Sequence, residues 1–122
     1  MSLLSLSSSR CYYLHQGATN MRKSFNGLSA LIRAELEQSP LSGNVFIFFN
    51  RHRNQVKLLL FEGDGFGIFH KRLEKGTFEL PKTTGESQDG IIAWHDLQFI
   101  LQGVDLTSIR FRKRYHRKII AA

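Results

Sequence analysis

The hydrophobic pattern of the chain is densest between residues 44 and 80, where short apolar runs alternate with polar turns. Four runs of strand length, rich in Phe, Val, Ile and Leu, predict strands at residues 45–49, 56–61, 66–73 and 77–80. The polar residues 50–54 suit a hairpin loop, and the two glycines of residues 62–65 suit a tight turn. Pro81 ends the pattern because it lacks the N–H of a strand ladder. The sequence therefore predicts an antiparallel meander.

Before the meander, the apolar positions take the period of a helix. Spacings of three and four relate Met21, Phe25, Leu28, Ile32 and Leu36. We expect a helix over residues 21–38, capped by Thr19 or Asn20 and stopped by Ser39 and Pro40. Because the meander strands are apolar on both faces, this helix is expected to cover one face of the sheet.

Weaker signals flank these two segments. Residues 10–15 predict a first strand, residues 91–94 a short strand or loop, and residues 95–102 a short helix that Gly103 ends in the left-handed conformation. The predicted fold class is α+β, with an antiparallel sheet of four or five strands, one long helix packed on it and a short C-terminal helix.

Charge divides the chain into a near-neutral body and a basic tail. The 122 residues, enough for one domain, carry 17 Lys and Arg against 10 Asp and Glu, a net charge of +7. Residues 106–122 hold six of these cations and no acid, so the body retains 11 cations against 10 acids. We expect a disordered leader at residues 1–9, a single domain at 10–105 and a basic C-terminal tail at 106–122.

Signals for export or membrane insertion are missing from the sequence. No apolar run approaches the ~20 residues of a membrane span, and the serine-rich N-terminus lacks the basic flank and cleavage pattern of a secretory signal. The single cysteine, Cys11, excludes an internal disulfide. These features predict a cytoplasmic protein that does not engage a membrane.

Side chains suited to metal or acid–base chemistry are scattered. The five histidines and Cys11 have no metal-ligand spacing, and Glu62 and Asp64 belong to an ordinary glycine turn. The glycine-rich stretch at residues 63–67 lacks the lysine and the following helix of a phosphate loop. We therefore predict no catalytic residue, no metal and no cofactor.

Clustered cations are the remaining candidate chemistry. Arg22 and Lys23 occupy the first turn of the predicted helix, where backbone N–H groups favour an anion, although an incidental placement on a solvated turn is the alternative. The tail interleaves its cations with Phe111 and Tyr115, which suits a phosphate backbone with stacked bases, while a solvated tail or an oligomer contact is the alternative. The predicted nucleic-acid contacts are Arg22, Lys23, Arg51, Arg53, Lys71, Arg72, Arg110, Arg112, Lys113, Arg114, Arg117 and Lys118.

Residues 19–32, 40–81 and 97–106 resemble the TnpB accessory proteins of bacterial insertion sequences of the insertion sequence sixty-six type, also called Orf2-like proteins. These are distinct from the RNA-guided nuclease that shares the name TnpB. The most specific matches are residues 21–23, 40–43, 50–57 and 69–76. The resemblance implies a role in transposition beside a separate, larger transposase, and it implies no catalysis by this protein.

The expected function is a non-enzymatic accessory factor for transposition that binds element DNA, the transposase or both. One alternative is a protein–protein adaptor whose cations meet an acidic face of the transposase. The least favoured alternative is a small RNA-cleaving enzyme using His70, Lys71 and Glu62. Sequence-specific reading of DNA is not expected, because the sequence contains no evident recognition helix.

Overall fold

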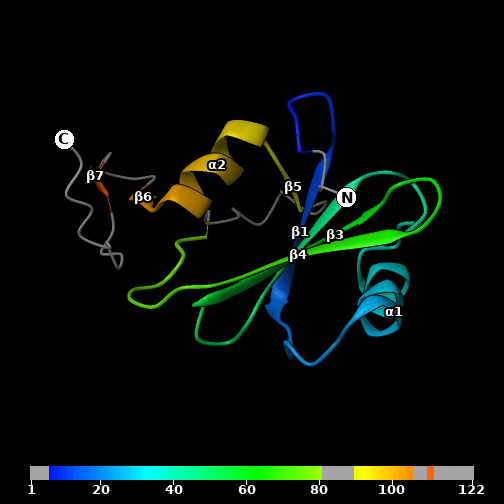
Figure 1. Cartoon of the computed structure of the whole chain (residues 1–122), viewed down its shortest axis with the longest axis horizontal. Coiled ribbons are helices and arrows are strands. Elements are labelled where there is room, and N and C mark those ends of the chain that lie inside the picture. The colour runs from blue at the N-terminus through cyan, green and yellow to red at the C-terminus, as the bar shows by residue number, and fades with distance from the viewer. Residues whose placement is uncertain (1–5, 81–89, 106–109, 112–122) are drawn as a thin grey trace.

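The computed structural model describes residues 6–80, 90–105 and 110–111, with a five-stranded sheet at the centre (Figure 1). The strand order in this sheet is β4-β3-β2-β1-β5. The strands are β1 (Tyr12–Ala18), β2 (Val45–Phe49), β3 (Gln55–Phe61), β4 (Phe66–Arg72) and β5 (Ile91–Ile92). Helix α1 spans Phe25–Glu35 and helix α2 spans Trp94–Gln102. A second, two-stranded sheet pairs β6 (Val104–Asp105) with β7 (Arg110–Phe111).

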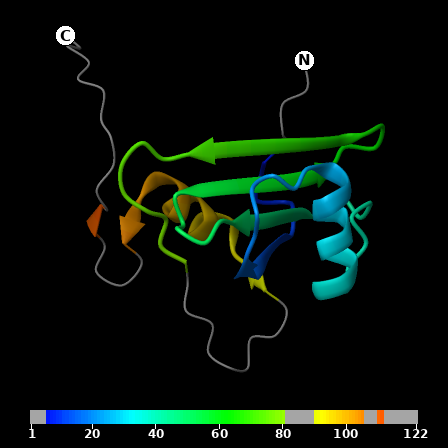
Figure 2. The same ribbon diagram turned by 90° about the horizontal axis from the view of Figure 1, so that it is seen from below.

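The predicted meander is confirmed for β2, β3 and β4. Both strand pairs are antiparallel, with Phe48 opposite Lys57 and Lys57 opposite His70. Figure 2 shows β4 at the open edge of the sheet. The predicted strand at residues 77–80 does not form. The Phe78 N–H donates to the Arg53 carbonyl in the loop between β2 and β3, and its ring packs against Phe49 with the ring centroids 5.4 Å apart.

The sheet is mixed, so the prediction of a purely antiparallel sheet was wrong. Strand β1 runs parallel to β2, with Tyr12 opposite Val45, and only its other neighbour β5 is antiparallel to it. Helix α1 connects β1 to β2 and crosses one face of the sheet, which returns the chain in the same direction. The sequence pattern identified the strands and the helix but not the direction that this crossover imposes.

Helix α1 begins later and ends earlier than the predicted residues 21–38. Residues 20–23 form a turn instead, in which the Asn20 side chain accepts a hydrogen bond from the Arg22 N–H at 2.8 Å. The Lys57 ammonium donates hydrogen bonds to the carbonyls of Met21 and Lys23, so these carbonyls bond to a side chain and not to N–H groups of a helix. Ser24, not Thr19 or Asn20, is the N-cap residue. At the other end, Glu37 adopts a left-handed φ of 52° that stops the helix.

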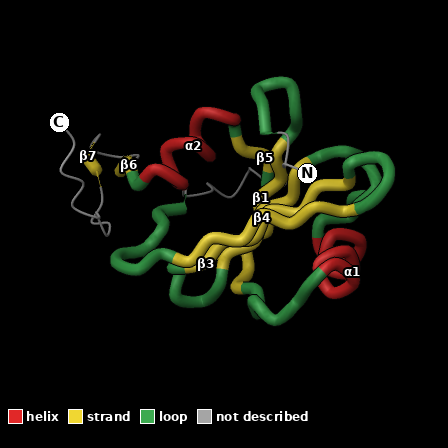
Figure 3. The backbone as a smooth tube through the Cα atoms, viewed as in Figure 1, coloured by secondary structure: helices red, strands yellow, loops and turns green. Residues whose placement is uncertain are grey.

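The two helices lie on opposite sides of the sheet (Figures 1 and 3). Leu28 and Ile32 of α1 pack on one face, against a buried set formed by Phe46, Phe48 and Leu59. Helix α2 covers the other face, where the buried residues are Tyr12, Leu14, Val45, Ile47, Phe49, Val56, Leu58, Leu60, Leu73, Phe78, Leu97 and Ile100. The predicted second helix is confirmed, including its end at Gly103 with a φ of 87°. None of the described helices has the length and apolar character to cross a membrane.

Candidate nucleic-acid interface

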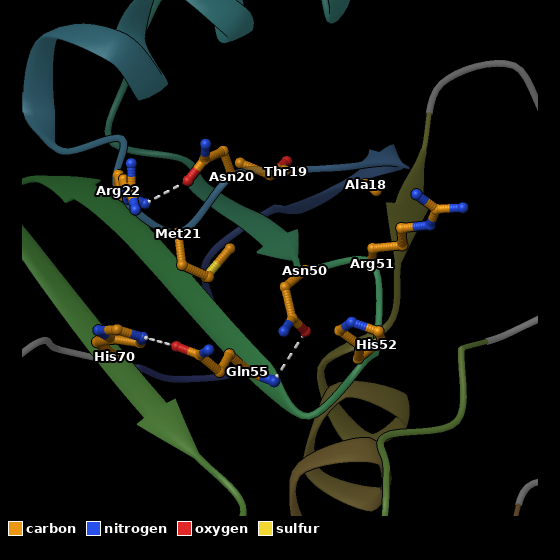
Figure 4. Close-up of a pocket in the computed structure, with 10 residues that line it drawn as sticks. All are labelled: Ala18, Thr19, Asn20, Met21, Arg22, Asn50, Arg51, His52, Gln55 and His70. Carbon is orange, nitrogen blue, oxygen red and sulfur yellow. Dashed lines mark hydrogen bonds between the residues drawn. The ribbon is translucent and has the colours of Figure 1, made fainter.

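A hollow of about 510 Å³ opens on the α1 side of the sheet, between the turn that precedes α1 and the β2–β3 loop (Figure 4). We call it the polar hollow. Its lining residues are Ala18, Thr19, Asn20, Met21, Arg22, Asn50, Arg51, His52, Gln55 and His70. Four of these side chains carry or can gain positive charge, and none is acidic. Segments distant in sequence therefore converge on an electropositive surface.

The amide oxygens that line the polar hollow are engaged within the protein. Asn50 Oδ1 accepts from the backbone N–H groups of Asn54 and Gln55, at 3.0 and 2.9 Å. Gln55 Oε1 lies 2.9 Å from His70 Nε2, and Asn20 Oδ1 is held by the Arg22 N–H. Each of these oxygens already accepts at least one hydrogen bond from the chain, so the N–H₂ donors of Asn20 and Gln55 are the amide groups most available to a ligand.

Lys57 lies beneath this surface and is 8% exposed. Its ammonium donates to the carbonyl oxygens of Met21, at 2.9 Å, and Lys23, at 2.7 Å. No described carboxylate lies within ion-pair distance of it. A buried charge that is balanced only by carbonyl dipoles leaves a positive potential around it. Lys57 therefore both fixes the turn before α1 and charges the neighbouring surface.

His70 is a titratable group whose pKa responds to this positive potential. Partial burial lowers its pKa below the usual 6.5, and the positive charges of Lys57 and Arg72 lower the pKa further. The neutral ring donates from Nε2 to Gln55 Oε1, because a carboxamide oxygen can only accept. Protonation at Nδ1 would add a further donor and a further charge at the edge of the polar hollow.

The structure brings together only some of the residues predicted from sequence. Arg22 and Arg51 both line the polar hollow, although the Arg51 side chain points away from Met21 and Gln55 in Figure 4. Lys23 and Arg53 are exposed beside it without lining it. Arg22 and Lys23 precede the helix instead of occupying its first turn, because α1 begins at Phe25.

The remaining predicted contacts lie elsewhere. Lys71 is on the opposite face of the sheet, with its Nζ 3.5 Å from the Leu101 carbonyl oxygen. Arg72 is exposed, with its Nη2 4.0 Å from Glu74 Oε2. The backbone of Arg110 forms part of β7. The other predicted tail contacts, Arg112, Lys113, Arg114, Arg117 and Lys118, lie outside the described residues, as does the predicted leader up to residue 5.

Sequence reasoning missed Lys57, and it did not connect Asn20, Gln55 and His70. The available signal was a lysine inside the apolar run at residues 56–61, where the alternation of side chains places it on the same face as Leu59. A charged residue at a buried strand position indicates a specific partner.

The structure does not bring together His70, Lys71 and Glu62, the residues of the RNA-cleaving alternative. Successive side chains of a strand point to opposite faces, so His70 and Lys71 of β4 are divided by the sheet. Glu62 follows the end of β3, about 16 Å along the strand from the Lys57 position that pairs with His70. Within the described residues, no three His, Cys, Asp or Glu side chains are grouped to hold a metal ion.

The fold and the site define a small α+β protein with a mixed sheet and a cation-lined hollow. Residues 10–111 match the family of IS66 Orf2-like proteins, and the chain belongs to this family. Membership indicates an accessory role associated with the transposition of an insertion sequence, as the resemblance of the sequence implied.

Two relatives come from Sinorhizobium fredii (strain NBRC 101917 / NGR234). The protein y4hO is 34% identical over 95 residues, which cover 76% of this chain and 79% of the relative. The protein y4jC is 27% identical over 93 residues, covering 75% and 76% respectively. Both are described as uncharacterized. No solved structure matches this chain significantly.

Proposed function

We propose that this protein is a non-enzymatic accessory factor of transposition that works in the cytoplasm and binds element DNA through its phosphate backbone. The observation that carries the proposal is the polar hollow, in which Arg22 and Arg51 share a surface with no acidic lining residue. Phosphate contacts of this kind position a protein on DNA without reading its sequence. The tail cations from Arg110 to Lys118 extend the contact along the backbone.

A salt titration of the full chain tests this proposal. The affinity for a fluorescently labelled duplex from an element end is measured by anisotropy as the salt concentration rises. Each phosphate contact contributes about −0.9 to the slope of log K against log salt. Replacement of the six tail cations by glutamine should therefore make the slope less negative by about 5, and the Arg22→Gln and Arg51→Gln pair should make it less negative by about 2.

The matched control is the Lys71→Gln and Lys75→Gln pair, which also removes two cations and leaves the polar hollow intact. Lys71 is itself a predicted contact from sequence, but it lies on the opposite face of the sheet. An equal loss of slope in both pairs would contradict the polar hollow as the contact surface. Absence of DNA affinity at low salt would overturn the proposal.

A second candidate function is an adaptor of the transposase without DNA contact. A groove of about 670 Å³ runs beside α1 and includes Ala30, Ala34, Leu41 and Phe66 among its lining residues. Leu41 is 52% exposed there, and an exposed apolar surface of this kind is typical of protein contacts. Tight binding of purified transposase, lost in a Leu41→Asp variant and accompanied by no DNA affinity, would favour the adaptor.

A further inference from the structure

We propose that the polar hollow is a binding site for a single phosphate group, held by the side-chain N–H donors of Asn20, Arg22 and Gln55 above the buried charge of Lys57. This inference deepens the proposed function and rests on it, because the phosphate is taken to belong to a nucleic acid. It assigns the ligand chemistry to one surface, whereas the proposed function requires only that cations meet DNA.

The first support is the hydrogen-bonding character of the hollow. The oxygens of Asn20, Asn50 and Gln55 all accept hydrogen bonds from this chain. Among the described lining side chains, the groups left to meet a ligand are mainly donors: the amide nitrogens of Asn20 and Gln55 and the guanidinium of Arg22. A surface that offers several donors, and whose amide oxygens already accept hydrogen bonds from the chain, matches a ligand whose oxygens accept, such as a phosphate.

The second support is the uncompensated charge of Lys57. Burial of an ammonium is costly unless an opposite charge accompanies it. Here the two contacts are the carbonyls of Met21 and Lys23, and Met21 itself lines the hollow. Besides partial burial, the Lys57 charge contributes to the lowered pKa of His70, another residue that lines the hollow. A phosphate in the hollow would supply the missing negative charge across this turn.

The third support is size. A phosphate group alone is much smaller than a hollow of about 510 Å³, which falls in the range of sites for small organic ligands. Met21 contributes an apolar surface and His52 a ring at the rim, and these suit an attached sugar or base. The ligand chemistry is thus a phosphate ester, either an internal phosphodiester or a terminal phosphate.

Phosphate binding should be coupled to the protonation of His70. The charges that act on His70 are those of Lys57 on β3 and Arg72 on β4, and the other cationic or titratable side chains that line the hollow are Arg22, Arg51 and His52. Partial burial, together with the charges of Lys57 and Arg72, lowers the pKa of His70 in the free protein, and a bound phosphate would raise it again. Binding therefore takes up a proton, so affinity should rise as the pH falls through the window between the two pKa values.

The test uses NMR titrations of the full chain with three probes. Thymidylyl-thymidine contains an internal phosphodiester, its 5′-phosphorylated form adds a terminal phosphate, and thymidine contains none. We expect both phosphate probes to shift the side-chain amide signals of Asn20 and Gln55, whereas thymidine leaves them unchanged. Stronger binding of the 5′-phosphorylated probe would assign the site to a DNA end, and equal binding would assign it to the backbone.

Gln55→Glu places a carboxylate in the hollow with almost no change of shape, and it should weaken phosphate binding at least tenfold. Gln98→Glu makes the same change on α2 and should have no effect. In a His70→Gln variant, the rise in affinity on lowering the pH should become smaller. Equal affinities of the Gln55→Glu and Gln98→Glu variants, or equal shifts with thymidine, would overturn the site.

The two proposals fail in different ways. If duplex DNA binds through the tail while the short phosphate probes leave the hollow unchanged, the phosphate site is wrong and the proposed function stands. If the probes bind in the hollow but duplex DNA does not bind at low salt, the proposed function is wrong and a nucleic-acid source for the phosphate is lost with it.

Discussion

Replacement of Lys57 by methionine removes the ammonium group and keeps most of the apolar length of the side chain. The ammonium donates two hydrogen bonds, and bonds from a charged group contribute about 1.5–3 kcal/mol each. Two terms offset this gross loss of roughly 3–6 kcal/mol. The variant no longer buries a charge, and water can reach the carbonyls because Met21 is half-buried and Lys23 is exposed. We expect a net loss of about 2 kcal/mol in the free energy of unfolding.

Urea denaturation provides the assay. Trp94, the sole tryptophan, stacks on Tyr12 with the ring centroids 5.3 Å apart, so its fluorescence should report unfolding. With a urea dependence of about 1–3 kcal/mol per M, the loss corresponds to a midpoint lowered by about 1 M. Lys75→Met is the matched control, because Lys75 is exposed and the variant should change stability by less than about 0.5 kcal/mol. If Lys57→Met were as stable as Lys75→Met, the role of Lys57 in holding the turn before α1 would be refuted.

Two further substitutions test the packing of β1. Gly90 has a φ of +68°, and a Cβ there would collide with the Leu14 carbonyl oxygen. Gly90→Ala should therefore lower the free energy of unfolding by at least about 2 kcal/mol. The control Gly65→Ala, with no atom within 4 Å of its Cβ, should be near neutral. Equal urea midpoints for the two alanine variants would contradict this. The buried ring of His15 lies 2.6 Å from Glu35 Oε1 and packs on Phe48, so His15→Ala should cost about 2–3 kcal/mol. His95→Ala, at a side chain that is 71% exposed, serves as the control, and a similar loss in both would show that the His15 contacts are unimportant.

The sequence alone was sufficient for the elements whose signals are local. Alternating apolar runs and a glycine turn specify the β2–β4 meander, because the backbone preferences of a hairpin depend on neighbouring residues. Helix α2 and its end at Gly103 were predicted for the same reason. The cations Arg22 and Arg51 could be identified as candidates, but no local signal indicated that they share a surface.

Tertiary structure decided the features that depend on contacts between distant residues. The direction of β1 relative to β2 follows from the crossover through α1, and the first residue of α1 depends on a lysine more than 30 residues later in the chain. The polar hollow arises in the same way, from the turn before α1, the β2–β3 loop and β4. Periodicity along a chain records which face of an element is apolar, whereas the pairing of those faces is settled only when the whole chain closes around its core.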